Sequence, residues 1–198
     1  MEKPAPGNAP IHSLIQYRWS PRAFKPQSMS PEQVRTLLEA ARWAASAFNE
    51  QPWCFLVARR DQPEAFAALL ACLVPANQKW AQNAGLLILS FAHTTFTRNG
   101  KPNIHAFHDV GLAAGQLALQ ATALGLQAHM MAGIDREHIA ATYTLPADHE
   151  AVAGIAVGVP DDPGSLEEPL AERERAPRER NALETFCFQD EFGKGLAF

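Results

Sequence analysis

Residues 85–92 read Gly-Leu-Leu-Ile-Leu-Ser-Phe-Ala, a continuous apolar run with the length of a β-strand. A strand that is apolar throughout, rather than at alternate positions, is covered by other structure on both faces. Helical and strand-like segments are interspersed along the chain on either side of this run. The run therefore predicts a central sheet with helices on both sides of it.

Two long helices accompany this strand. Ser30, Pro31 and Gln33 form the pattern of a capping box with proline in the first helical turn, and apolar residues at helical spacing continue to about Ala45. The second helix covers about residues 107–124 and is apolar nearly all round. Such a helix must be buried on more than one side, and in a chain this small a subunit interface would supply the cover.

Shorter patterns supply the other elements. Strands are expected near residues 53–58, 126–131 and 152–159, and helices over residues 11–17, 63–73 and 135–143. Residues 1–10 hold three prolines and a glycine and are expected to form a flexible arm, followed by one domain over residues 11–198. Residues 93–104 are polar and predict an exposed loop that could act as a lid.

The last forty residues differ in character from the body. Residues 160–180 are rich in Pro, Glu and Arg and cannot form a core of their own. Phe186, Cys187 and Phe188 then return to apolar character. This pattern predicts a C-terminal extension, from about residue 160 onward, that docks on another surface.

The composition excludes several classes of protein. With 47% hydrophobic and 19% charged residues, the chain is not expected to be disordered. The net charge of −4 gives no reason to expect a nucleic-acid partner, and no run approaches the roughly 18 apolar residues of a membrane span. The start of the chain lacks the apolar stretch of a secretory signal. Cys54, Cys72 and Cys187 lack metal-ligand spacing, so reduced thiols, a cytoplasmic location and no metal site are expected.

Two basic motifs are candidates for binding a phosphate. In Arg18-Trp19-Ser20-Pro21-Arg22, two guanidinium groups flank a hydroxyl on a segment that proline keeps extended. Arg178 and Arg180 form a second pair near the end of the charged stretch. Each motif taken alone equally fits a solvated turn or a solvated charged face.

Two further segments could contact a planar ligand. Residues 45–53 join a helix to a strand, and the carboxamide of Asn49 offers the donor and acceptor that match the pyrimidine edge of a flavin. In residues 130–135, Gly133 lets backbone amides approach a ligand closely at the end of a strand, and Asp135 would cap the next helix. Ordinary turns remain the alternative reading of both segments.

The order of these motifs resembles the nitroreductase family. The resemblance covers about residues 11–188, and its motifs are Arg-x-Ser-x-Arg at 18–22, Ser-x-x-Asn-x-Gln-Pro-Trp at 46–53, Ala-Leu-Gly-Leu at 123–126, Gly-x-Asp at 133–135 and Arg-x-Arg at 178–180. Residues 108–114 are similar to the start of that family's dimer-interface helix. The resemblance implies an α+β three-layer sandwich with a mainly antiparallel sheet, an intertwined homodimer whose C-terminal extension packs on the partner, and FMN at the interface.

The resemblance also implies roles for particular residues. The implied cofactor contacts are Arg18, Trp19, Ser20, Arg22, Ser46, Asn49, Asn77, Ala132, Gly133, Arg178 and Arg180. The arginines and Ser20 would meet the FMN phosphate and ribityl chain, and Ser46 and Asn49 would reach the flavin from the partner subunit. The backbone amide of Gly133 would lie near flavin N5 and O4.

Three positions depart from the family pattern. Many members have Pro where this chain has Ala45 and Glu where it has Ala132, and some have a basic residue in place of Trp80. A backbone amide serves whatever side chain it carries, so Ala132 would alter the substrate rather than flavin binding. Trp80 leaves the residues around the phosphate open, although Lys79 adjoins it.

The implied reaction is reduction of small organic substrates such as nitroarenes or quinones. NADPH or NADH would pass a hydride to flavin N5 and leave before the oxidant binds, which gives ping-pong kinetics. Protons can come from solvent, so no catalytic acid or base is expected, and His108 and His129 are interpreted as structural. Phe48, Phe96 and His105 are expected to line the substrate pocket together with Trp19.

Three alternatives remain open from the sequence. The first is another flavin reaction on the same scaffold, such as azoline oxidation, dehalogenation or flavin cleavage. The second is a flavin-binding protein without turnover. The third is a binding module that holds no flavin.

Overall fold

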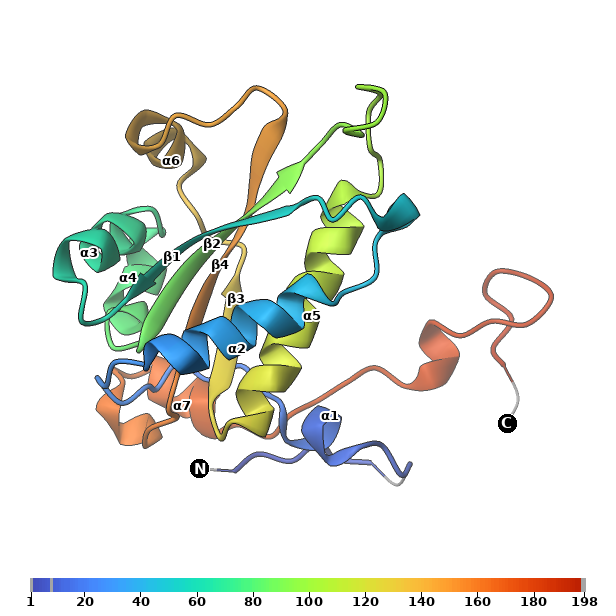
Figure 1. Ribbon diagram of the computed structural model, residues 1–198. Coiled ribbons are helices and arrows are strands. Elements are labelled where there is room, and N and C mark those ends of the chain that lie inside the picture. The colour runs from blue at the N-terminus through green and yellow to red at the C-terminus, as the bar shows by residue number, and fades with distance from the viewer. Residues whose placement is uncertain (1, 8, 197–198) are drawn as a thin grey trace.

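A four-stranded antiparallel sheet in the order β1-β2-β4-β3 forms the centre of the computed structural model, which describes residues 2–7 and 9–196 (Figure 1). The strands are β1 (Trp53–Arg59), β2 (Leu86–His93), β3 (Gln127–Met131) and β4 (His149–Gly158). Every residue of β2 up to Ala92 is buried, as the apolar run predicted. Strand β4 begins three residues before its predicted start. Residues 1, 8, 197 and 198, parts of the expected arm and extension, lie outside the described residues.

Two long helices cover one face of the sheet and lie side by side across it (Figure 1). Helix α2 (Pro31–Arg42) begins with the predicted capping box, in which Gln33 N donates to Ser30 Oγ over 3.1 Å and Ser30 N donates to Gln33 Oε1 over 2.9 Å. Helix α5 (Ala106–Ala123) packs on α2 and on the sheet. Leu86, Ile88 and Val157 belong to the core beneath them.

Shorter helices cover the opposite face. They are α3 (Pro63–Ala71), α4 (Pro75–Ala81), α6 (Arg136–Thr142) and α7 (Leu170–Arg175). Leu87, Leu89 and Phe91 of β2 point into this second core, because successive strand residues face opposite ways. The three-layer α+β arrangement predicted from the resemblance is therefore confirmed for one chain. Helix α4 was missed by the sequence analysis, which ended the preceding helix at residue 73.

The long helix α5 is not fully covered within one chain. Its inner residues are buried, but Phe107 and Leu112 are 45% and 39% exposed. Apart from the neighbouring backbone of α5 itself, no atom of the described residues would lie within 4 Å of a Cβ added at Gly111 or Gly115. Burial of α5 on more than one side, as expected from the sequence, would therefore require a partner surface that the described residues do not provide.

The N-terminal arm lies against the body through several contacts of its described residues. Ala5 N donates to the carbonyl of Gln16, in α1 (Ser13–Tyr17), over 2.7 Å. Lys3 Nζ donates to the carbonyls of Glu174 and Ala176, at the end of α7. The arm therefore connects α1 to the end of α7 rather than standing clear of the body.

The segment expected to be an exposed loop is exposed over most of its length but not throughout. Phe96 and Asn103 are buried, whereas residues 97–102 face solvent. Phe96 N donates to the carbonyl of Lys101 over 2.8 Å, which closes the tip into a tight turn. The prediction of an exposed loop over residues 93–104 therefore holds for residues 97–102 and for Ile104, which is 83% exposed. It was wrong for residues 93–96, which are half-buried or buried, and for Asn103, which packs inward.

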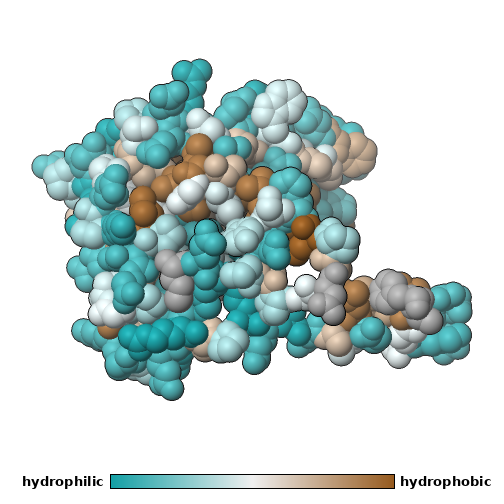
Figure 2. Space-filling view, turned by 90° about the horizontal axis from the view of Figure 1, so that it is seen from below, coloured by the Kyte–Doolittle hydropathy of each residue, from teal (hydrophilic) through white to brown (hydrophobic). Residues whose placement is uncertain are grey.

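The C-terminal tail projects from the body of the chain. Figure 1 shows residues after α7 running away from the sheet, and Figure 2 shows them as a separate arm. Phe186 is 58% exposed and Phe192 is 97% exposed. Up to residue 196, the last that the structure describes, the tail does not dock on its own body, and its docking on a partner stays a prediction. Among the described residues, no helix is both long and apolar enough to cross a membrane.

Candidate functional site

A basic cleft of about 240 Å³ lies where the N-terminal segment meets the chain after α7. Its lining consists of Lys3, Arg18, Trp19, Ser20, Arg22, Arg173, Glu174, Ala176, Pro177, Arg178 and Arg180. Both basic motifs singled out in the sequence therefore meet at one place. Lys3 and Arg173 are additions that sequence reasoning missed, since each is an isolated charge in a proline-rich or charged segment.

A buried carboxylate fixes the backbone of the first motif. Glu174 is 2% exposed, and its Oε1 accepts from Arg22 N over 2.8 Å and from Ala23 N over 3.0 Å, across 152 and 151 residues of sequence. Trp19 N donates to Gln127 Oε1 over 3.0 Å. With its backbone held at these points, the segment presents the side chains of its two arginines to the cleft.

The second motif is tied to the arm. Arg178 Nη1 donates to the carbonyls of Lys3 and Gln16, over 2.7 and 2.9 Å. The ammonium group of Lys3 lies 5.2 Å from the ring centre of Trp19, in a cation–π contact. Arg178 is thus linked to the arm by backbone carbonyls rather than by an acidic side chain, so these contacts leave its positive charge in the cleft.

The charges in the cleft repel one another. Burial lowers the pKa of Arg18, and the neighbouring Arg178 and Arg180 lower it further. The pKa of Arg178 is lowered by burial and by Arg180. Burial also lowers the pKa of Lys3, with Glu174 opposing the shift. Because crowded, partly desolvated cations gain most from an opposite charge, the cleft is suited to a phosphate group, whose oxygens accept several guanidinium hydrogen bonds.

Two residues beside the cleft are structural. The ring of His129 packs on Trp80 with 4.6 Å between ring centres, and its Nδ1 lies 2.9 Å from the carbonyl oxygen of Pro21. Burial and the charge of Arg22 lower the pKa of His129 to about 4, so the ring is neutral at pH 7 and donates to that carbonyl. Trp80 is 2% exposed and lies in the core, while Lys79 pairs with Glu167 over 3.6 Å. Neither Trp80 nor Lys79 lines the cleft.

The segment 46–51 lies elsewhere and does not line the cleft. Phe48, Asn49 and Gln51 have φ values of 55°, 58° and 53°, a left-handed conformation that non-glycine residues adopt at a cost. Hydrogen bonds hold it, because Ala47 N donates to Asp109 Oδ2 and Gln51 N donates to Ser46 Oγ, each over 3.0 Å. Asn49 remains exposed in this fixed segment.

Aromatic residues expected at the substrate pocket do meet. Phe48 and Phe96 pack edge to face with 5.9 Å between ring centres. The guanidinium carbon of Arg98 lies 4.1 Å from the ring centre of Phe48 and 5.2 Å from that of Phe96. Arg98 was not singled out in the sequence, where nothing marked it. His105, the third expected residue, is exposed at the start of α5.

The turn around Gly133 is close-packed. Asn77 Nδ2 donates to the Gly133 carbonyl over 3.1 Å, and a Cβ at Gly133 would come within 2.7 Å of Asn77 Nδ2 and 2.8 Å of a Val74 methyl. A glycine is thus required here for packing. This requirement supports the interpretation of the segment as a structural turn. Ala132 beside it is exposed. Asp135 caps α6 as predicted, since its side chain accepts from His138 N over 2.9 Å.

A model of the nitroreductase family matches residues 15–159, which include all four strands and α5. The chain belongs to the nitroreductase family. The matched region holds the first basic motif and the segments around Asn49 and Gly133. The second basic motif lies beyond it.

Known relatives and structures agree with this assignment. The chain is 30% identical to Protein DrgA of Synechocystis over 76% of its own length and 85% of that protein. A solved structure described as an oxidoreductase containing FMN is 36% identical, with a TM-score of 0.90 and 96% of each chain covered. A Desulfovibrio desulfuricans protein whose structure was solved in complex with FMN is 30% identical, with a TM-score of 0.64, over 88% of this chain and 100% of that one. The nitroreductase fold thus extends to nearly the whole chain.

Proposed function

We propose that this nitroreductase-family protein is an FMN-dependent oxidoreductase that uses NADPH or NADH to reduce nitroaromatic, quinone or related small organic substrates. The observation that carries the proposal is the basic cleft, where Arg18, Arg22, Arg178 and Arg180 converge on one volume. Two similar proteins of known structure contain FMN. When bound, FMN would supply hydride transfer between a nicotinamide and a second substrate at one site, which would give ping-pong kinetics.

The residues of the cleft fit the phosphate end of the cofactor. Among the described lining residues, six basic side chains face one acidic side chain, and that carboxylate is already engaged by the Arg22 and Ala23 amides. Ser20 Oγ accepts from Arg18 Nη1 over 3.2 Å, which leaves its hydroxyl proton free to donate to a phosphate or ribityl oxygen. Lys3 and Arg173 join the arginines predicted from the sequence.

A homodimer with shared sites is the second part of the proposal. Ser46 and Asn49 do not line the cleft, so a flavin held by its phosphate there would receive them from a second copy. The uncovered face of α5 and the projecting C-terminal tail support such a partner, since both leave large apolar side chains exposed. The tail would pack on the partner and bury Phe186.

The substrate position would be bordered by Phe48, Phe96, Arg98 and His105. The two aromatic rings suit flat substrates, and the guanidinium of Arg98 stacked on them adds a positive charge. No residue is assigned as an acid or base. The Gly133 amide would support the flavin, with Asn77 holding the Gly133 carbonyl in place.

An absorbance spectrum of the purified protein tests the proposal. Flavin bands that bleach on anaerobic addition of NADPH or NADH, and return on addition of a quinone, are expected. A protein that stays colourless after incubation with FMN would refute flavin binding. Flavin bands that neither nucleotide bleaches would instead indicate a flavin-binding protein without this turnover.

A further inference from the structure

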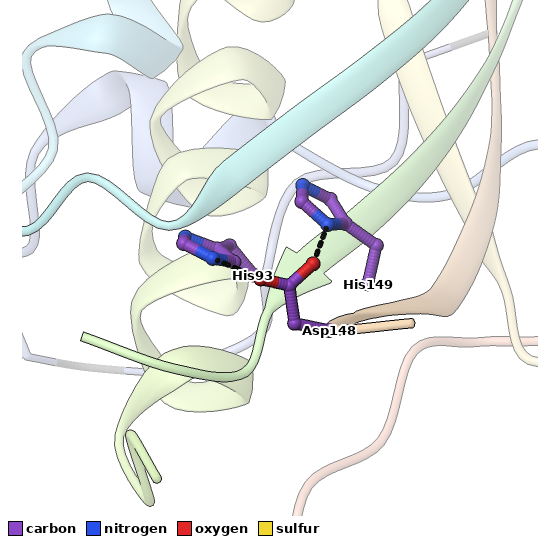
Figure 3. A group of neighbouring side chains, drawn as sticks. All are labelled: His93, Asp148 and His149. Carbon is purple, nitrogen blue, oxygen red and sulfur yellow. Dashed lines mark hydrogen bonds and ion pairs between the residues drawn. The ribbon is translucent and has the colours of Figure 1, made fainter. Parts of the chain in front are cut away.

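A cluster of two imidazoles and a carboxylate lies apart from the basic cleft (Figure 3). His93 Nε2 lies 2.9 Å from Asp148 Oδ2, and His149 Nδ1 lies 2.9 Å from Asp148 Oδ1. One ligand atom from each of the three residues lies within 4.8 Å of the other two. The proposed oxidoreductase reaction gives none of these three side chains a role.

The sheet places the two histidines. His93 ends β2 and His149 begins β4, and the two are opposite each other in the antiparallel register. Their rings are stacked with 4.8 Å between centres and 20° between planes. Asp148 directly precedes β4, so its carboxylate reaches both rings, as Figure 3 shows. The positions of these groups are therefore set by backbone pairing rather than by a flexible loop.

Two imidazole nitrogens and one carboxylate oxygen are a known ligand set for transition metals. Bonds of about 2.0 to 2.2 Å in tetrahedral geometry place neighbouring ligand atoms about 3.3 to 3.5 Å apart. The two 2.9 Å separations, which run to different oxygens of Asp148, would need to open by a few tenths of an ångström to admit an ion. The three ligand atoms lie within 4.8 Å of one another, so a side-chain rotation that brings the more distant pair closer would complete the site.

The surroundings leave the cluster accessible. The side chains of His93 and His149 are 19% and 21% exposed, and that of Asp148 is 41% exposed. His149 also borders a cavity of about 280 Å³. Thr95 Oγ1 lies 3.2 Å from His93 Nε2, close enough to orient a ligand in a fourth coordination position. An ion could therefore enter from solvent and keep one exchangeable ligand.

The cluster stands at the base of the segment that carries Phe96. Thr94 donates to the Asp148 carbonyl through its amide over 2.8 Å and through its hydroxyl over 3.0 Å. We propose that His93, Asp148 and His149 bind a divalent transition-metal ion, with Zn²⁺ as the representative, and that the ion fastens the base of residues 94–105 to the start of β4. The site is independent of the flavin proposal, because none of its ligands lines the basic cleft.

Calorimetric titration of the EDTA-treated, untagged full-length protein with Zn²⁺ tests the site. One ion per chain is expected for the unchanged protein and for His138→Gln, a matched control whose exposed histidine on α6 lies outside the cluster. His93→Gln and His149→Gln should each weaken binding at least tenfold, because each removes a ligand. Absence of saturable binding below millimolar Zn²⁺, or equal binding by the control and the cluster variants, would overturn the site.

A second readout does not depend on any variant folding. Co²⁺ added to the unchanged protein should give the visible absorption of a low-symmetry nitrogen–oxygen site, which excess Zn²⁺ abolishes. Zn²⁺ should also slow trypsin cleavage after Arg98, which is exposed at the tip of the segment. A featureless Co²⁺ spectrum contradicts the ligand set, and cleavage rates unaffected by bound Zn²⁺ contradict the fastening role.

Discussion

The basic cleft and the segment 46–51 are both built with fixed backbones, but they differ in what their side chains face. In the cleft, Arg18 and Arg178 face each other closely enough that each is affected by neighbouring positive charge. In the segment 46–51, Phe48 and Asn49 are held in a strained conformation and face solvent. The cleft thus gathers its charges within one chain, whereas the segment holds Asn49 exposed to solvent, as the proposed contact with a partner's flavin would require.

The backbone strain of the segment 46–51 indicates that its conformation is fixed by the surrounding structure. Three left-handed non-glycine residues cost on the order of 1 to 3 kcal/mol each, and such conformations persist where the surrounding structure determines them. Here Asp109, a buried side chain of α5, accepts from Ala47 N and so couples the segment to the helix with the uncovered face. The same helix would therefore set both the partner surface and the residues offered to the partner's site.

Removal of the Glu174 carboxylate should have the largest effect on stability, because it releases the backbone of the segment that carries Arg18 and Arg22. Glu174→Ala leaves the Arg22 and Ala23 amides without their acceptor, with an expected loss of about 2 to 4 kcal/mol in unfolding free energy. Urea denaturation measures it. Glu172→Ala, an exposed change on the same helix, should cost little, and Glu174→Gln should fall between the two because it keeps a carbonyl acceptor. Equal stability of the two alanine variants would show that the carboxylate does not hold the segment.

His129 should make the stability of the fold depend on pH. The pKa of His129 in the folded chain is about 4, below its ordinary value of 6.5. Between these two pH values the unfolded chain therefore binds a proton at His129 and the folded chain does not. Stability from this residue is therefore fully present above about pH 6.5 and is lost as the pH falls towards 4, by up to about 3 kcal/mol. Urea midpoints should show a shallower decline over this range for His129→Gln. Parallel declines in the two proteins would refute the neutral buried ring.

Arg22→Ala should weaken FMN retention while leaving the fold intact. A lost charge-assisted hydrogen bond of about 1.5 to 3 kcal/mol corresponds to roughly a tenfold to 150-fold rise in the dissociation constant. Fluorescence titration with FMN measures it. Arg35→Ala, an exposed change on α2, is the control. If both variants keep the unchanged affinity, Arg22 has no part in phosphate binding and the cleft loses its proposed ligand.

Sequence reasoning succeeded where local chemistry carries the information. The capping box at Ser30 and the doubly covered strand β2 follow from residues adjacent in sequence. It failed where distant segments determine the outcome. Lys3 contacts the cleft only because the arm meets α7, 171 residues later, and His93 meets His149 only through strand register. No short-range spacing marks either pairing.

The meeting of the two basic motifs is an intermediate case. Their residue types predicted a phosphate site, but only the order of motifs in a resembling family suggested that they belong together. The contact itself depends on Glu174, whose burial could not be read from a Glu- and Arg-rich stretch. Helix α4 was missed for a local reason, because Pro75 interrupts the pattern and the following residues are mostly polar or small.

Asn49→Ala is expected to have the smallest effect, and it sharpens the comparison most. One neutral hydrogen bond is worth about 0.5 to 1.5 kcal/mol, so FMN affinity should fall by about two- to twelvefold or the flavin potential should shift. Ser30→Ala, remote from both regions, controls for a general loss of stability. A titration that changes neither affinity nor potential removes Asn49 from the site.

Mixed dimers then decide which chain supplies Asn49. A heterodimer of Arg22→Ala and Asn49→Ala chains, isolated by two different affinity tags, carries both defects in one site and none in the other if the sites are shared. Half of its FMN should bind with unchanged affinity, and the other half more weakly than to either homodimeric variant. If each chain instead supplies both residues, each site has one defect and no unchanged fraction appears. Sedimentation that finds only monomers with tightly bound FMN would exclude the shared site altogether.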